Sequence, residues 1–419
     1  MTSREPGEGP RKRRFAPVRP QDPLLAEQER AVTEREQRVT PLELFFDLVF
    51  VYAVTQVTTL MSQDLTWRGV GHGMLVLAAL WWAWTGYAWL TNMLEPEEGL
   101  VRAGMFAAMA AMLIAAIAVP GAFGVDAMLF GVAYVLVRLV NLALDAIAGK
   151  RDPEFRRAIV RFAPTATLGP VLILTAGFAD GAARTALWVI AIAAMYSGPL
   201  IDRGLGWQIS PGHFAERYGL VVIIALGESI VAIGFATVGI EITGAVILAA
   251  VLGLAVIAAL WWAYFDVMAV LGQQQLARTG GVTRARIARD AYSYLHLPMI
   301  AGIVLFALGL KVTTHDVHEP LALIPAVALC GGVSLYFWSH VLLRLRLVAL
   351  VRRTTDERPG WIGPGRLVAA IAGLALIPAA LAVPGLVALA MVAAVCWGLI
   401  VWDVLHYRED RVQVRQARP

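Results

Sequence analysis

Apolar residues run through most of the chain in long stretches, which short polar and charged segments separate. Each stretch has about 20 residues, the length that an α-helix needs to cross the roughly 30 Å hydrocarbon core of a bilayer. We therefore predict an all-α, polytopic membrane protein with about twelve transmembrane helices. The expected spans are 42–61, 71–93, 101–119, 125–147, 158–178, 183–201, 217–237, 243–270, 291–311, 321–343, 364–382 and 385–405.

The composition agrees with a membrane protein. Hydrophobic residues make up 58% of the 419 residues and the mean hydropathy is +0.66, whereas soluble domains hold about 45–50% apolar residues. The two cysteines, Cys330 and Cys396, lie inside apolar stretches. This placement argues against a disulfide framework or a cysteine-based metal site.

The basic residues predict the orientation. Of the 35 Lys and Arg, we assign only Arg68, Arg184 and Lys311 to outer loops and Arg138 to a span, and we place the remainder in the tails and inner loops. Since positive residues stay in the cytoplasm, both termini are expected there. The pI of 9.2 follows from this asymmetry. It does not indicate nucleic-acid binding, although a basic inner face attracts anionic lipid.

Short internal matches predict a duplication. Segments in the two halves that align are 47–56 with 219–228, LWWAW (80–84) with LWWAY (260–264), and Asp202 with Asp403 at the end of each half. An even number of spans gives both halves the same orientation, so they would be parallel repeats with a site at their interface. The predicted organisation is a partly disordered cytoplasmic tail (1–40), two six-helix repeats (41–205 and 206–406) and a basic cytoplasmic tail (407–419).

Two carboxylates lie in the first span. Glu43 and Asp47 are one helical turn apart on one face. An ionisable residue at bilayer depth costs roughly 2.5–3.5 kcal/mol on insertion scales, so each marks a candidate functional site. Gln56 points to the opposite side of the same span. A helix that is polar on two sides is expected to lie in the centre of its half.

Glu228 is the most deeply placed carboxylate of the second half. It is expected at mid-membrane, among small residues that let helices approach closely. By alignment its partner in the first half is Gln56. Glu228 is a candidate for transport or gating, and the alternative is a protonated side chain that donates one interhelical hydrogen bond.

Arg138 and Asn141 share one face of the fourth span with Asp145. Arginine stays charged in proteins, so Arg138 needs an anion, and Asp47 and Asp145 are the candidates. The alternative is a structural clamp between helices. In the second half His340 takes the place of Arg138, and histidine changes its charge near neutral pH. One half would then carry a fixed charge and the other a switchable one.

His296 and Asp266 are expected near the inner ends of their spans, in the region that also holds Glu43 and Asp47. Such crowding indicates a water-filled inner vestibule. The alternative is an interfacial position, which we favour for Asp145 and Asp266.

Enzymatic signatures are missing from the sequence. No phosphate-binding glycine loop, HExxH or GxSxG motif occurs. The segment HDVHE (315–319) could be taken for zinc ligands, but a zinc site needs three or four ligands in a fixed geometry, which this short segment does not indicate. We therefore expect no catalytic residues, no metal and no cofactor.

Several segments resemble the bacterial low temperature requirement A (LtrA) family. They are PLELFFDLVFVYAVTQ (41–56), WLTN (89–92), HFAERYGLVVIIALGESIVAIG (213–234) and YSYLHLPMIAGIVLFALGL (292–310). The resemblance implies a multi-pass protein of the bacterial inner membrane and brings no settled biochemical activity. The first helix also resembles, at the level of fold, that of a cation-channel family with a Phe-Ser-Asp motif. Phe46 and Asp47 match that motif, but no serine lies between them.

These observations favour passage or sensing of an ion or small solute, with a proton link through Glu228 and His340. The expected partners are the lipid bilayer and that solute, with no nucleic acid. The alternatives are a membrane-embedded, lipid-interacting enzyme or factor, and a structural or assembly protein without transport. The sequence determines neither the solute nor the oligomeric state.

Overall fold

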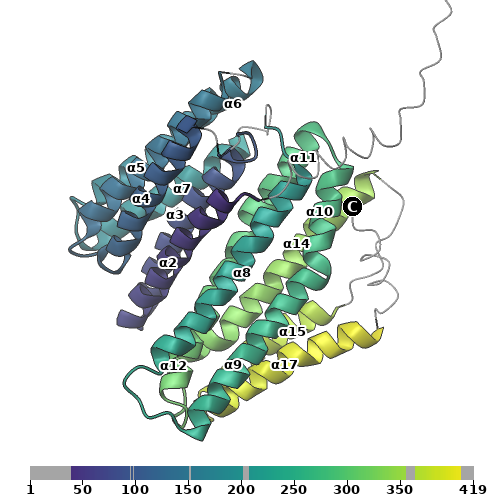
Figure 1. The fold of residues 1–419 in the computed structure, drawn as a ribbon. Coiled ribbons are helices and arrows are strands. Elements are labelled where there is room, and N and C mark those ends of the chain that lie inside the picture. The colour runs from purple at the N-terminus through teal and green to yellow at the C-terminus, as the bar shows by residue number, and fades with distance from the viewer. Residues whose placement is uncertain are drawn as a thin grey trace, which may run out of the picture. The chain divides into compact units, whose positions relative to one another are not determined.

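A computed structural model describes residues 39–94, 96–97, 99–150, 152–201, 207–354 and 364–406. Within these residues the regular structure is helical, and the only β-type pairing is an isolated bridge between Pro320 and Pro384. The all-α prediction is thus confirmed (Figure 1). The expected tails, except for Val39 and Thr40, lie outside the described residues, and so does Asp202.

The helices fall into two groups in chain order. The first group consists of α2 (Pro41–Gln63), α3 (Trp67–Leu90), α4 (Gly99–Ala118), the 3-10 turn η1 (Val119–Gly121), α5 (Ala127–Ala148), α6 (Pro153–Ala176) and α7 (Gly181–Ile201). The second group begins with α8 (Pro211–Ala236), α9 (Gly244–Ala263), the π-helix η2 (Tyr264–Met268), α10 (Ala269–Arg278), α11 (Gly281–Ile287) and the π-helix η3 (Ala288–Tyr294). It continues with α12 (His296–His315), α13 (Leu323–Ala326), the π-helix η4 (Val327–Gly331), α14 (Gly332–Thr354), α15 (Gly365–Ala375), α16 (Ile377–Ala380) and α17 (Gly385–His406).

By length and composition, ten helical segments of the described chain could cross a membrane. They are Pro41–Gln63, Trp67–Leu90, Gly99–Gly121, Ala127–Ala148, Pro153–Ala176, Pro211–Ala236, Gly244–Arg278, Gly281–His315, Leu323–Val348 and Gly385–His406. Helix α7 and the shorter segment Gly365–Ala380 occupy the places of the expected sixth and eleventh spans. Ten apolar helices establish a membrane protein, while the number twelve remains a prediction.

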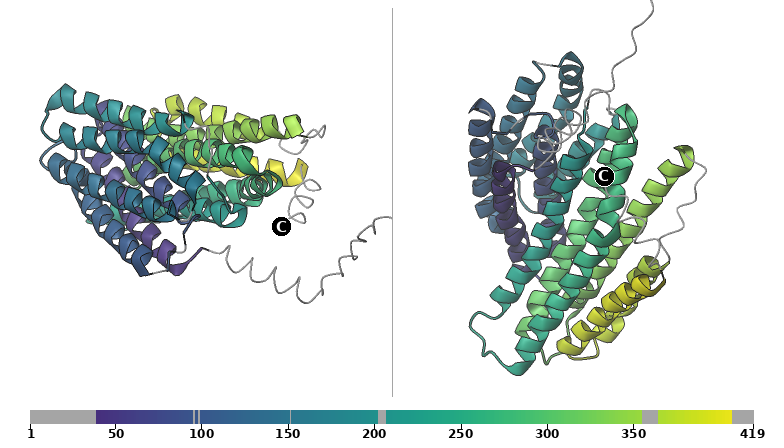
Figure 2. Two further views of the ribbon diagram at one scale, coloured as in Figure 1. Left: turned by 90° about the horizontal axis from the view of Figure 1, so that it is seen from above. Right: turned by 45° about the vertical axis from the view of Figure 1, so that its right-hand side comes forward.

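Each group closes through the same sequence of helix contacts. In the first group α2 packs on α3 and α4, α4 on α5, α5 on α6, α6 on α7, and α7 returns to α3. In the second group α8 packs on α9 and α12, α12 on α14, α14 on α15, α15 on α17, and α17 returns to α9. Figure 2 shows the purple-to-teal and green-to-yellow helices gathered in this way. This pattern fits parallel repeats, although the repeat boundaries remain a prediction.

Helix α2 joins the two groups, because it also packs on α8 and α12. One of its faces is buried in these contacts, and the other is exposed at Leu44, Phe45, Leu48 and Tyr52. Helix α2 is therefore central on one side only, and not on both as its polar residues predict. The only polar group expected there, Gln56, is uncharged, and a neutral amide is far less costly to remove from water than a carboxylate.

Candidate functional site

Helix α2 begins in a way that fixes the Glu43 carboxylate. Thr40 is the N-cap, Pro41 occupies the first turn, and Glu43 is the third helical residue, as in a capping box. The Thr40 backbone N–H donates to Glu43 Oε2 at 2.9 Å, and the Glu43 N–H donates to Thr40 Oγ1 at 3.4 Å. A carboxylate at this end is also favoured by the partial positive charge of the helix N-terminus. Glu43 is thus held in place before it meets any other helix.

Helix α8 begins beside α2 and runs in the same direction. Pro211 lies in its first turn, and the Ser210 N–H donates to Asn92 Oδ1 at 3.0 Å. His213 and Arg217 follow at a spacing of four, so they lie on one face of α8, as Glu43 and Asp47 do on α2. The two helix starts therefore present complementary pairs to each other.

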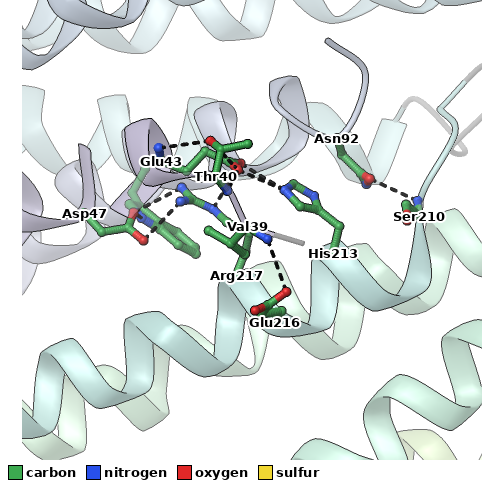
Figure 3. Close-up of polar contacts among 10 residues, drawn as sticks. Val39, Thr40, Glu43, Asp47, Asn92, Ser210, His213, Glu216 and Arg217 are labelled. Carbon is green, nitrogen blue, oxygen red and sulfur yellow. Dashed lines mark hydrogen bonds and ion pairs between the residues drawn. The ribbon is translucent and has the colours of Figure 1, made fainter. Parts of the chain in front are cut away.

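These four side chains form what we call the α2–α8 charge cluster: Glu43, Asp47, His213 and Arg217 (Figure 3). His213 Nε2 lies 3.0 Å from Glu43 Oε1. Arg217 Nη2 lies 3.0 Å from Asp47 Oδ1, Arg217 Nη1 donates to Asp47 Oδ2 at 3.1 Å, and Arg217 Nε is 3.7 Å from Glu43 Oε1. Arg217 therefore bridges both carboxylates of α2.

Protein covers the α2–α8 charge cluster on every side. Glu43 and Arg217 are 0% exposed and Asp47 is 1% exposed. The Trp84 indole N–H of α3 donates to Asp47 Oδ1 at 2.9 Å, and the Arg217 guanidinium lies 5.6 Å from the centre of the Trp84 ring. Charges removed from water need this combination of opposite charge and hydrogen bonds. The water-filled vestibule expected around Glu43 and Asp47 is therefore replaced by a packed ionic contact.

The sequence reasoning missed His213 and Arg217. It placed the start of the seventh span at residue 217, so His213 fell in the preceding loop and Arg217 at the very end of the span, and neither was considered as a partner. A signal was nevertheless present, because the spacing of four in Glu43 and Asp47 recurs 170 residues later in His213 and Arg217 with opposite charge. Arg217, and not Arg138, is the partner of Asp47.

Glu228 lies further along the same helix contact. It is 2% exposed, and its carboxylate accepts a hydrogen bond from the Thr55 hydroxyl of α2. Thr58 and Ser229, both buried, lie on the same two helices. Glu228 therefore faces α2 and contacts Thr55, the neighbour of the residue with which it is aligned. Gln56, the aligned residue, is half-buried.

Arg138, Asn141 and Asp145 line one pocket, as their shared helix face predicts. Arg138 Nη1 donates to Asn141 Oδ1 at 3.1 Å, and Arg138 is 2% exposed. Asp145, for which we favoured an interfacial position, is only 4% exposed. Protein therefore covers the Asp145 side chain, while its depth in the membrane remains a prediction.

The two candidate histidines of the second half, His296 and His340, lie in an aromatic environment. His296 is 1% exposed, with Nε2 at 2.9 Å from the Tyr264 hydroxyl and Nδ1 at 2.9 Å from the Ala291 carbonyl. His340 is fully buried, and its Nδ1 lies 3.0 Å from the Tyr336 carbonyl. Both histidines therefore lie beside tyrosine rings: Tyr264 of η2 contacts both, and Tyr336 of α14 contacts His340.

A metal site is not found among the described residues, because no group of three or more His, Cys, Asp or Glu side chains converges there. The α2–α8 charge cluster consists of two carboxylates, an imidazole and a guanidinium. Its chemistry is that of charge pairing and proton exchange.

The comparisons with known proteins agree with the sequence resemblance. A family model described as "Bacterial low temperature requirement A protein (LtrA)" matches residues 38–401. A protein of Rhizobium meliloti (strain 1021), described as uncharacterized, is 32% identical over 309 residues, which cover 70% of this chain and 74% of that protein. The matched region contains every residue of the α2–α8 charge cluster. The chain therefore belongs to the bacterial low temperature requirement A (LtrA) family of membrane proteins.

Proposed function

We propose that this protein passes a small ion or solute across the bacterial inner membrane along the contact of α2 with α8 and α12. The observation that carries the proposal is a polar seam on the buried face of α2. It consists of Glu43, Asp47, Thr55, Thr58 and Ser62, and its outer end meets Lys311, whose Nζ donates to Ser62 Oγ at 3.1 Å. A helix that only packs against its neighbours has little need of polar side chains at both ends of its buried face.

The depth of the charged groups supports a pathway. Glu228 lies eleven residues after Arg217 on α8, which is about 16 Å along a helix at 1.5 Å per residue. That is about half the thickness of the hydrocarbon core. The α2–α8 charge cluster would then stand at the cytoplasmic entrance and Glu228 at the middle of the membrane.

An apolar stretch interrupts the seam between Asp47 and Thr55. Phe50 and Val54, both buried, occupy this part of α2, and the Phe50 ring centre is 5.9 Å from that of Trp84. Apolar constrictions close channels by excluding water. The described arrangement would therefore be a closed state, in which the Arg217 ion pairs and the Phe50 contact hold the entrance shut.

Ion flux into liposomes that contain purified protein tests this proposal. Wild type and Glu228→Gln are compared at two pH values with a panel of cations and anions. Glu241→Gln is the matched control, because Glu241 is exposed in the loop after α8. We expect flux that depends on pH and falls at least about tenfold in Glu228→Gln, while Glu241→Gln behaves like wild type. His340→Arg should abolish the pH dependence if His340 carries the proton link.

The structural alternative makes the opposite prediction. If Glu228 only clamps helices, no ion is conducted by any variant and Glu228→Gln changes the midpoint of unfolding alone. Phe50→Ala provides a second arm, because removal of the ring should raise flux in a protein that conducts. Absence of flux in wild type and in Phe50→Ala would refute the proposal.

A further inference from the structure

A pocket separate from the polar seam opens between the first group of helices and the α11–η3 segment. Its wall is formed by Trp82, Thr85, Gly86 and Trp89 of α3, by Arg138, Asn141 and Asp145 of α5, and by Phe162, Pro199, Trp207, Ala285, Arg286, Arg289 and Ser293. The cavity volume is about 70 Å³. We propose that this pocket, which we call the Arg138 pocket, binds a phosphate ester through Arg138 and Asn141.

Arg138 lacks an anion at ion-pair distance. The guanidinium is 2% exposed, its one hydrogen-bond partner is the neutral Asn141 amide, and its Nε has no partner among the described residues. Asp145 lies on the same wall, but it does not approach Arg138 within 4.0 Å. A buried arginine with unused donors needs an acceptor. The pocket into which it points is the place for one.

Asn141 adds a second unused donor beside Arg138. Its Oδ1 accepts from Arg138, which leaves Nδ2 as the free end of the amide, and Nδ2 has no partner among the described residues. Two neighbouring donors of this kind suit an anion that carries several oxygens. Phosphate is the common group that offers three, and arginine recognises it with its planar fork of N–H groups.

Gly86 lets the Arg138 and Asn141 side chains lie close against α3. A Cβ atom built at Gly86 would lie 2.5 Å from Arg138 Nη1 and 2.8 Å from Asn141 Oδ1. Any larger residue would therefore displace the donor pair. Glycine at this position thus allows the two donors to lie where they line the Arg138 pocket.

The rest of the wall defines the ligand further. Arg286 is exposed, and the half-buried Arg289 is held by Asp290 at 2.6 Å and by the Pro199 carbonyl at 2.8 Å. Three arginines and one aspartate thus line the pocket. Trp82, Trp89 and Phe162 supply apolar surface. A phosphate that carries an apolar body fits this combination, and two sources offer it: an anionic phospholipid or a soluble phosphate ester.

Thermal unfolding of the purified full-length chain in a neutral detergent tests the proposal. Dioleoyl phosphatidylglycerol is the lipid probe, phosphatidylcholine its zwitterionic counterpart, and glycerol 3-phosphate and inorganic phosphate are the soluble probes. Ligands that bind the folded state raise Tm with concentration, which yields an apparent Kd. Stabilisation by phosphatidylglycerol alone would assign the site to lipid, and stabilisation by glycerol 3-phosphate as well would assign it to phosphate esters in general.

Three variants locate the binding. Gly86→Ala displaces Arg138 and Asn141, Arg138→Gln removes the buried charge, and Arg286→Gln removes an exposed charge from the wall of the pocket. The control is Arg278→Gln, which removes an exposed arginine outside the Arg138 pocket. We expect Gly86→Ala and Arg138→Gln to raise the apparent Kd at least tenfold, Arg286→Gln to raise it severalfold, and Arg278→Gln to leave it unchanged.

Two results would overturn the proposal. One is the absence of any Tm shift in wild type with all four probes. The other is a shift that Gly86→Ala and Arg286→Gln leave unchanged, or that Arg278→Gln reduces as much as Arg286→Gln does, because the anion would then bind to the basic surface in general.

Discussion

Loss of Arg217 should destabilise the protein more than loss of either carboxylate that it contacts. Arg217→Gln leaves Asp47 without its ion pair and Glu43 with His213 alone, and all of these groups are buried. Removal of one partner from a buried ion pair costs about 3–5 kcal/mol. Asp47→Asn should cost less, about 1.5–3 kcal/mol, because Arg217 keeps Glu43 at 3.7 Å and the asparagine oxygen can still accept from Trp84.

The double variant Asp47→Asn/Arg217→Gln isolates the interaction. Since both charges are removed together, we expect it to be no less stable than Arg217→Gln alone, which corresponds to a coupling of about 1.5–3 kcal/mol. Reversible unfolding in mixed micelles, followed by circular dichroism as the mole fraction of dodecyl sulfate rises, measures all three variants.

The exposed pair Asp64 and Arg68 is the matched control. Its atoms are 3.8 Å apart and the side chains are 35% and 80% exposed, so the same substitutions there should change stability by no more than about 0.5 kcal/mol. The reasoning would be refuted if Arg217→Gln unfolded like this control, or if the effects of Asp47→Asn and Arg217→Gln were simply additive.

The same unfolding assay tests two further sets of substitutions, and cysteine labelling tests a third prediction. Gly309→Ala should destabilise the protein by about 1–3 kcal/mol, because the new Cβ would lie 2.4 Å from the backbone nitrogen of Leu329 and force α12 away from η4. Gly227→Ala is the control and should be close to neutral, because its Cβ would meet no atom within 4 Å. Tyr134→Phe and Tyr336→Phe should each cost about 0.5–1.5 kcal/mol, since the hydroxyls donate to backbone carbonyls of α3 and α9 at 2.8 and 2.7 Å. Equal stability to wild type would contradict this. Both cysteines are fully buried. Maleimide should therefore label neither cysteine in mild detergent and both after unfolding. Rapid labelling of the folded protein would contradict the packing described.

The helices and the burial of particular faces could be predicted from the sequence. Apolar stretches of membrane length locate the helices because every backbone N–H and C=O must be satisfied within the bilayer. The spacing of four places Glu43 and Asp47 on one side of α2, and both are buried. Arg138, Asn141 and Asp145 likewise share a wall, since residues three and four apart on a helix are neighbours.

The partners of these residues could not be predicted from local spacing. Arg138 was expected to pair with Asp47 or Asp145, yet Asp47 pairs with Arg217, and Arg138 faces a pocket. The predicted span started at residue 217, whereas α8 starts at Pro211 and carries His213 and Arg217 in its first two turns. A hydropathy pattern assigns such charged first turns to the preceding loop.

The sequence by itself thus determined that this chain is a bundle of membrane-length helices and which face of each helix carries polar side chains. Only the tertiary structure decided that α2 and α8 lie side by side in the same direction, which brings residues 170 positions apart into ion pairs. The physical reason is that helical periodicity acts within a few residues. The choice of neighbouring helix depends on close packing, such as that at Gly309, and on the pairing of all buried charges at once.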